Sequence, residues 1–103
     1  MGDVFKALAD PTRRAILDEL QERDGQTLFE LCTRLITRHG LTSSRQAVSQ
    51  HLAVLEEAGL VLTRREGRYK FHHLDTTPLR AITERWRLEH RGSTPEEDAC
   101  GSP

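Results

Sequence analysis

Residues 43–58 combine a buried stripe with a set of polar side chains at one end. If Val48, Leu52 and Leu55 form the buried side of a helix, helical geometry exposes polar residues near its N-terminal end. These residues are Ser44, Arg45, Gln46, Ser49 and Gln50. Arginine can pair with guanine, glutamine can pair with adenine, and serine can bind a base or a phosphate. Taken by itself, the pattern is more typical of an ordinary polar helix surface, so its meaning depends on the neighbouring segment.

A basic segment follows at residues 61–73. Two β-prone runs flank Glu66 and Gly67, and this arrangement predicts a β-hairpin. In the second run two sets of side chains alternate: Tyr69, Phe71 and His73 against Arg68, Lys70 and His72. Glu66 is the only acid among four cations: Arg64, Arg65, Arg68 and Lys70. A charged edge that prevents strands from aggregating explains one or two cations, but not four. Next to the polar helix, the segment therefore favours DNA binding, with the hairpin on phosphates.

The elements that must position these residues are marked by caps and glycines. Capping residues predict four helix starts: Asp3, Asp10 with Pro11, Thr27, and Ser43 with Gln46 as an S-x-x-Q capping box. Glycines predict three helix ends: Gly25, Gly40 and Gly59. A last helix is expected from about residue 77 to residue 90. The fold class is therefore mainly α with a small β-hairpin (α+β), a winged helix-turn-helix with the order α-α-α-α-β-β-α.

Length and charge fit one small domain that meets a polyanion. The chain has 103 residues, and we expect a single ordered domain over 1–90 and a disordered tail over 91–103. No apolar run is long enough for a membrane span, and the N-terminus lacks a signal-peptide pattern, so we expect a cytoplasmic protein. Residues 31–73 hold seven basic and three acidic residues between two acidic ends. This asymmetry suits a domain that presents its middle to nucleic acid.

Three separated segments resemble one family. Residues 7–17 (ALADPTRRAIL) resemble the opening of the ArsR-type (ArsR/SmtB-like) winged helix-turn-helix repressors. Residues 48–61 resemble their recognition helix, and residues 65–71 resemble their wing. The resemblance implies a prokaryotic, homodimeric transcriptional repressor that binds a palindromic DNA operator, with the dimer made by the first and last helices. The join at residues 37–43 is longer than is usual in the family.

The metal sites of this family are not matched. The best-known family site is a pair of cysteines one residue apart in the third helix, and here Cys32 is followed by Arg34 at the second position. One thiolate beside an arginine is a poor site for a thiophilic metal, so Cys32 is interpreted as a small core residue. A second family site uses Asp and His of the last helix, and here Asp75, Glu89 and His90 lack the expected spacing. We expect no metal and no cofactor.

The histidines at positions 51, 72 and 73 are interpreted as structural residues and not as metal ligands. His72 and His73 point to opposite faces of a strand and cannot chelate one ion together. His51 lies at the edge of the buried stripe and is expected to be packed and hydrogen-bonded. The operator sequence, the target genes and any small-molecule inducer stay open.

Apolar residues at both ends of the domain predict a homodimer. A domain of this size has a limited core, and each large apolar side chain buried against a partner adds about 1.5–3 kcal/mol. The residues expected at the interface are Val4, Phe5, Leu8, Leu79, Ile82 and Trp86. The alternative is that this stripe closes the core of the same chain, and both arrangements can hold at once.

Other function classes find less support. An enzyme is not expected, because the chain has no Gly-rich phosphate loop, no Cys/His pair at useful spacing and no G-x-S-x-G motif. A winged helix that binds proteins stays an alternative, although its wing would be less basic. A repressor that senses oxidation through Cys32 or Cys100 is a second alternative. Acids next to Cys100 in the sequence are expected to raise the pKa of its thiol, which argues against this reactivity.

Overall fold

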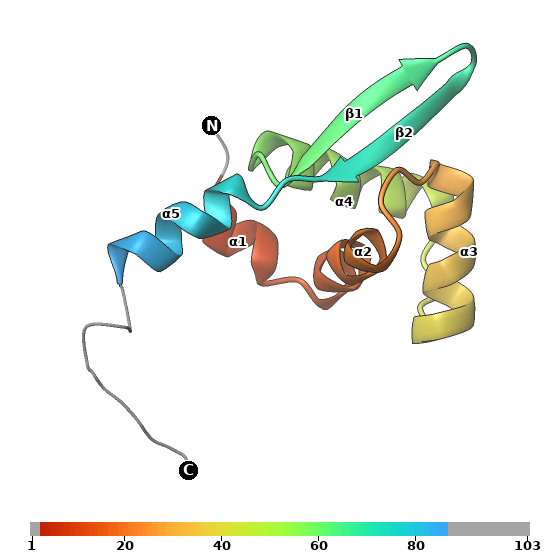
Figure 1. The fold of residues 1–103 in the computed structure, drawn as a ribbon. Coiled ribbons are helices and arrows are strands. Elements are labelled where there is room, and N and C mark those ends of the chain that lie inside the picture. Colours follow the sequence, from red (N-terminus) through yellow and green to blue (C-terminus); the bar gives the residue numbers. More distant parts are fainter. Residues whose placement is uncertain (1–2, 87–103) are drawn as a thin grey trace.

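The computed structural model describes residues 3–86, which form helices and one β-hairpin (Figure 1). The elements in chain order are α1 (Val4–Leu8), α2 (Pro11–Glu22), α3 (Leu28–His39), α4 (Arg45–Glu57), β1 (Val61–Glu66), β2 (Tyr69–Leu74) and α5 (Thr77–Arg85). This order confirms the predicted winged helix-turn-helix. The predicted end of the last helix at residue 90 and the tail over 91–103 lie outside the described residues.

Capping side chains start the helices where the sequence places them. Asp10 accepts a hydrogen bond from the Arg13 backbone N–H at 3.1 Å. Thr27 and Glu30 form a reciprocal capping box: the Glu30 N–H donates to Thr27 Oγ1 at 3.2 Å, and the Thr27 N–H donates to Glu30 Oε1 at 2.9 Å. Gly40 closes α3 in the left-handed conformation, with φ of 66°. Local chemistry therefore sets the bounds of α2 and α3.

The predicted cap of the recognition helix is wrong by one residue. The sequence favours a helix from Ser43 with Gln46 in its capping box, whereas α4 begins at Arg45. Ser44 is the cap, and its hydroxyl accepts from the Ala47 N–H at 3.1 Å. Both serines offer the same capping chemistry, and in the structure Ser44 is the one that lies at the N-terminus of α4.

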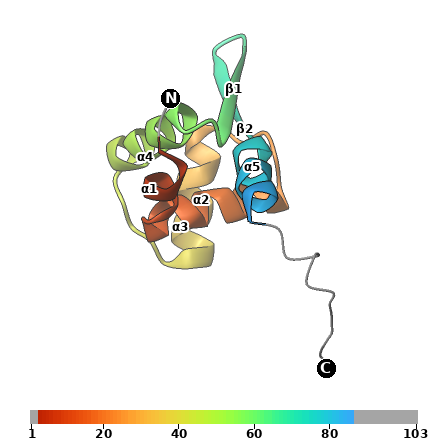
Figure 2. The same ribbon diagram turned by 90° about the vertical axis from the view of Figure 1, so that its left-hand side faces the viewer.

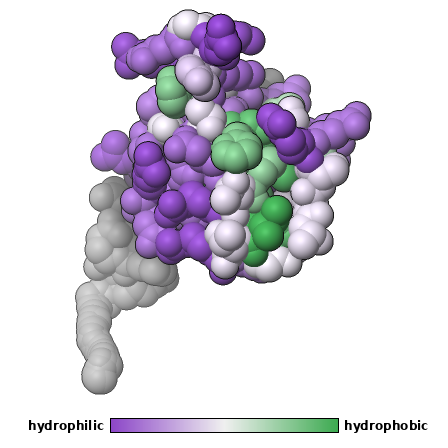
Figure 3. All heavy atoms as spheres, turned by 90° about the vertical axis from the view of Figure 1, so that its right-hand side faces the viewer, coloured by the Kyte–Doolittle hydropathy of each residue, from purple (hydrophilic) through white to green (hydrophobic). Residues whose placement is uncertain are grey.

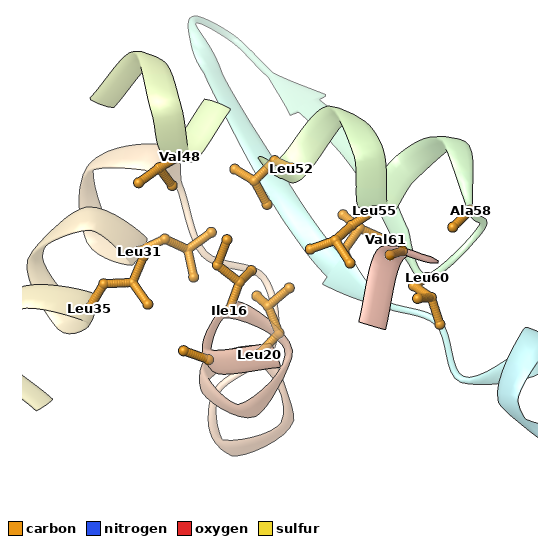
Figure 4. Close-up of a cluster of buried hydrophobic side chains, with 12 residues drawn as sticks. Ile16, Leu20, Leu31, Leu35, Val48, Leu52, Leu55, Ala58, Leu60 and Val61 are labelled. Atoms are coloured by element: carbon orange, nitrogen blue, oxygen red, sulfur yellow. The ribbon is translucent and has the colours of Figure 1, made fainter. Parts of the chain in front are cut away.

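The core lies between α2, α3, α4 and the start of β1 (Figure 4). Its largest buried side chains are Ile16, Leu20, Leu31, Leu35, Val48, Leu55, Leu60 and Val61. The predicted buried stripe of α4, Val48, Leu52 and Leu55, is confirmed. Because α2 contacts α1, α3, α4 and β2, it holds the two helices of the helix-turn-helix at a fixed angle.

The hairpin projects from the helical body, and only its base is attached (Figures 1 and 2). The strands are antiparallel, and the register pairs Val61 with Leu74. At the base, the Gln26 N–H donates to the His72 carbonyl at 3.1 Å, and the His72 N–H donates to the Gln26 carbonyl at 2.8 Å. The buried residue of β2 is His72, so the Tyr69–Phe71–His73 set is not the inward face. From here on, β1 and β2 with their turn are called the wing.

None of the helices in the described part of the chain is long and apolar enough to cross a membrane.

Candidate nucleic-acid interface

The N-terminal half of α4 presents polar side chains to solvent. Arg45, Gln46, Ser49 and Gln50 are all exposed, as the buried stripe of this helix predicts. Ser44 is exposed as well, but its hydroxyl is used to cap the helix. The described chain therefore leaves four side chains of the predicted set open to a ligand on this helix.

The wing carries its four cations in exposed positions. The register places Arg65 opposite Lys70 and Arg64 opposite Phe71, and opposed residues lie on one face of the hairpin. Arg64 lies 4.0 Å from Glu66. Within residues 3–86, no carboxylate lies within 4.0 Å of the other predicted cations, namely Arg45, Arg65, Arg68 and Lys70. As far as the described part of the chain goes, these four charges are open to an anion.

A groove of about 330 Å³ separates the recognition helix from the wing. It brings together four of the predicted site residues: Arg45 and Ser49 from α4, and Arg68 and Lys70 from the wing. Gln46 and Gln50 do not line it. The groove also includes Phe29 and Tyr69, which the sequence analysis did not select. Phe29 is 67% exposed. Its neighbours Leu28 and Leu31 lie at helical spacing in the sequence, and this pattern leaves Phe29 on the outer side of α3.

The face that includes the outer side of α3 is mostly hydrophilic, with a small hydrophobic patch (Figure 3). Phe29 and Ile36 are the exposed large hydrophobic residues of α3. Single exposed apolar residues are normal on a protein surface.

His72 closes the inner end of the groove as a neutral side chain. Burial lowers the pKa of His72, although its hydrogen bond to Gln26 acts in the opposite direction. His72 Nδ1 lies 2.9 Å from the Gln26 carbonyl oxygen, which can only accept, so this nitrogen carries the proton. The imidazole therefore fixes the base of the wing and adds no charge to the groove at neutral pH.

Two arginines of the basic middle segment belong to the fold. Glu19 on α2 is 2% exposed, and its carboxylate lies 2.5 Å from Arg34 Nε and 3.1 Å from Arg38 Nε. His39 Nε2 lies 2.8 Å from the same carboxylate. Burial by itself raises the pKa of Glu19, but hydrogen bonds from Arg34 and His39 and the charge of Arg38 outweigh it, so the pKa is lowered. Arg34 and Arg38 hold α3 against α2.

His51 connects the recognition helix to the start of the chain. Its Nδ1 lies 3.2 Å from Arg13 Nη1, and since a guanidinium only donates, the imidazole nitrogen accepts. Arg13 Nε also donates to the Ala7 carbonyl at 2.8 Å. The prediction that His51 is packed and hydrogen-bonded is confirmed.

The predicted absence of a metal site stays a prediction. Among residues 3–86, no three His, Cys, Asp or Glu side chains are grouped so that they could hold an ion. Cys32 is half-buried against the core, and burial raises the pKa of its thiol despite the nearby charge of Arg45. A raised pKa disfavours the reactive thiolate and with it the redox alternative at Cys32. Glu89, His90 and Cys100 lie outside the described residues.

Comparison with known proteins decides the family. The helix-turn-helix domain family matches residues 8–64. The chain is 36% identical over 90 residues to the arsenical resistance operon repressor of Escherichia coli, covering 84% of this chain and 72% of that protein. This chain belongs to the ArsR-type family of winged helix-turn-helix transcriptional regulators. It is therefore a DNA-binding transcriptional regulator and not an enzyme.

Other proteins similar to this ArsR-type regulator are also named as transcriptional regulators. The chain is 51% identical over 83 residues to YuzN of Bacillus subtilis, an uncharacterized HTH-type transcriptional regulator, covering 81% of this chain and 90% of YuzN. Among solved structures, an ArsR-like transcriptional regulator from Rhodococcus sp. RHA1 has a TM-score of 0.69 and 37% identity, covering 86% of this chain and 73% of that chain.

Proposed function

We propose that this regulator acts in a prokaryotic cell as a homodimeric repressor that binds a palindromic operator through α4 and the wing. The proposal rests on one groove, which brings two exposed polar side chains of α4, Arg45 and Ser49, together with two wing cations, Arg68 and Lys70. Within residues 3–86 neither wing cation has a carboxylate within 4.0 Å. A helix fits the major groove of DNA, and basic side chains beside it bind the phosphate backbone.

The residues proposed to contact DNA are those that the sequence selects. They are Ser44, Arg45, Gln46, Ser49 and Gln50 on or next to α4, and Arg64, Arg65, Arg68 and Lys70 on the wing. Arg64 is the weakest member, because it lies 4.0 Å from Glu66 and does not line the groove. The four exposed wing cations argue against a protein-binding winged helix, whose wing would be less basic.

The dimer is proposed to form through α1 and α5. Phe5 is 55% exposed and Trp86 is 57% exposed, and their ring centroids lie 6.5 Å apart. No residue of α5 is buried within the described chain. Val4, Leu8 and Leu79 pack partly against the core, and Ile82 is half-buried. The same stripe would thus serve both its own core and the partner subunit, and the proposed regulatory unit spans residues 1–90.

Trp86→Glu tests the dimer, because it places a charge in the proposed interface. We expect the variant to have a monomer mass by light scattering at concentrations where the wild type is a dimer. Ile36→Glu is a matched control, since Ile36 is 49% exposed on α3, and α3 lies on the opposite side of the helical body from α5 (Figure 1). A dimeric Trp86→Glu protein would refute this interface.

Selection of bound DNA from a random pool tests the function. A two-fold symmetric dimer should select an inverted repeat, with half-sites about 10–10.5 base pairs apart from centre to centre or a small multiple of that spacing. Recovery of sequences with no common motif would contradict the proposal. Transcription from a promoter that contains the selected repeat then tests repression, which matters because the relatives include the activator HlyU of Vibrio cholerae.

A further inference from the structure

We propose that the groove between α4 and the wing holds one sugar–phosphate strand of DNA. Arg45 and Ser49 then bind phosphate together with the wing, and base reading falls to Gln46 and Gln50. This inference rests on the proposed function and assigns roles within it. It differs from the expectation drawn from residue types, which places Arg45 and Ser49 among the base-reading residues.

The position of the wing beside α4 requires a backbone strand between them. The major groove of B-DNA is about 12 Å wide and accommodates a single helix. If α4 occupies that groove, the wing cannot enter it as well and must lie beyond the strand that borders it. The space between α4 and the wing is then the path of that strand, and the groove of about 330 Å³ is this space.

Helical geometry separates the two pairs of side chains on α4. Arg45, Ser49 and Glu56 follow one another at helical spacing along the side that faces the wing, and all three line the groove. Gln46 and Gln50 are each one residue further along, which turns them about 100° around the helix axis. They are exposed and do not line the groove, so they face the interior of the major groove when α4 is docked.

The chemistry of each side matches its proposed partner. The groove side offers three cations, Arg45, Arg68 and Lys70, with Glu56 as its one acid among the described lining residues. Phe29 supplies an apolar wall that suits the deoxyribose of the backbone. The outer side offers two uncharged amides, which can donate and accept at once and so pair with the edge of adenine.

The test uses the full chain and the repeat selected by the wild type. Arg45→Ala and Arg68→Ala should each weaken binding to every sequence by about tenfold. Each should lower the slope of log affinity against log salt by about one unit per lost contact, with the selected sequence unchanged. Gln50→Ala should leave the salt slope unchanged and relax the preference at one symmetric pair of base positions. Circular dichroism checks that each variant is folded.

Arg45→Lys is the decisive companion variant. A lysine supplies the point charge that a phosphate needs, but not the planar fork that pairs with guanine. We expect Arg45→Lys to keep both the salt slope and the sequence profile of the wild type. If Arg45→Ala or Arg45→Lys instead relaxes one base position at an unchanged salt slope, Arg45 reads a base and the inference is wrong, while the proposed function stands. If the wild type selects no sequence at all, the proposed function fails and the inference fails with it.

Discussion

The arginines of α3 and those near the wing belong to one basic segment but have opposite surroundings. Arg34 and Arg38 lie against the buried carboxylate of Glu19, and Arg38 also pairs with Glu22. Arg45 and Arg68 have no carboxylate within 4.0 Å among the described residues. The difference shows that the positive charges of this segment have two kinds of surroundings. Charges matched by α2 hold the helix-turn-helix together, and we propose that the unmatched ones bind DNA.

The strongest way to break this comparison is to remove the carboxylate that distinguishes the two regions. Glu19→Gln keeps the shape of the side chain but removes the negative charge that compensates Arg34 and Arg38. Because both arginines keep some contact with solvent, we expect a loss of about 2–4 kcal/mol in the free energy of unfolding, at or below the range for a broken buried pair. Urea unfolding measures it. Glu22→Gln, at a carboxylate that is 54% exposed, should lose less than about 1 kcal/mol.

The same carboxylate predicts how stability depends on acid. The folded state lowers the pKa of Glu19 below its ordinary value of 4.5, so the unfolded chain binds the proton more readily. Its contribution is therefore fully present above pH 4.5 and is lost as the pH falls through the lowered pKa. The free energies of unfolding of the wild type and of Glu19→Gln should converge as the pH is lowered from 7 to 3. A gap that stays constant over this range would contradict the assignment.

Arg13 sharpens the comparison, because it belongs to the fold although no carboxylate of residues 3–86 lies within 4.0 Å of its guanidinium. It donates to the carbonyls of Lys6 and Ala7 and to His51, and so connects α1 to α4. Arg13→Met should lower the free energy of unfolding by about 1–2 kcal/mol. Arg14→Met is the control, since Arg14 makes one such bond, to the Leu8 carbonyl. Equal losses in the two variants would refute the special role of Arg13.

The order of elements and most of their bounds could be predicted from the sequence, because they depend on local chemistry. Asp10, Thr27 and Gly40 act within one helical turn of themselves. The start of α4 was missed because Ser43 and Ser44 are equally good caps, and the path of the preceding loop chooses between them. Such a choice is made by the tertiary structure and leaves no local signal.

The candidate site could be predicted by residue type, but not by its division into two sides. Helical periodicity exposes Arg45, Gln46, Ser49 and Gln50 alike, and the position of the wing is needed to separate them. The pairing of Arg34 and Arg38 with Glu19 also joins residues from two helices. The net positive charge of residues 31–73 therefore includes two arginines that pair with a carboxylate of the same chain.

The smallest effect is expected from metal ions. Cys32 has a thiol whose pKa is raised by burial, and no second thiolate lies beside it in the described chain. Zinc, cadmium or arsenite at micromolar concentration should leave the affinity for the selected DNA unchanged, as followed by fluorescence anisotropy. Release of the DNA, or stoichiometric metal in protein purified without chelator, would show that a metal site exists.

The division between cations that stabilise the fold and cations that bind DNA is tested by the salt dependence of DNA affinity. The measurement compares Arg68→Ala with Arg38→Ala side by side. Both variants remove one arginine from the basic segment, so total charge is the same in each. We expect Arg68→Ala to lower the slope of log affinity against log salt by about one unit per lost contact, with the free energy of unfolding unchanged. Arg38→Ala should keep the wild-type slope and lose stability instead. Equal slopes for the two variants would contradict the division between cations that hold the fold and cations that hold DNA.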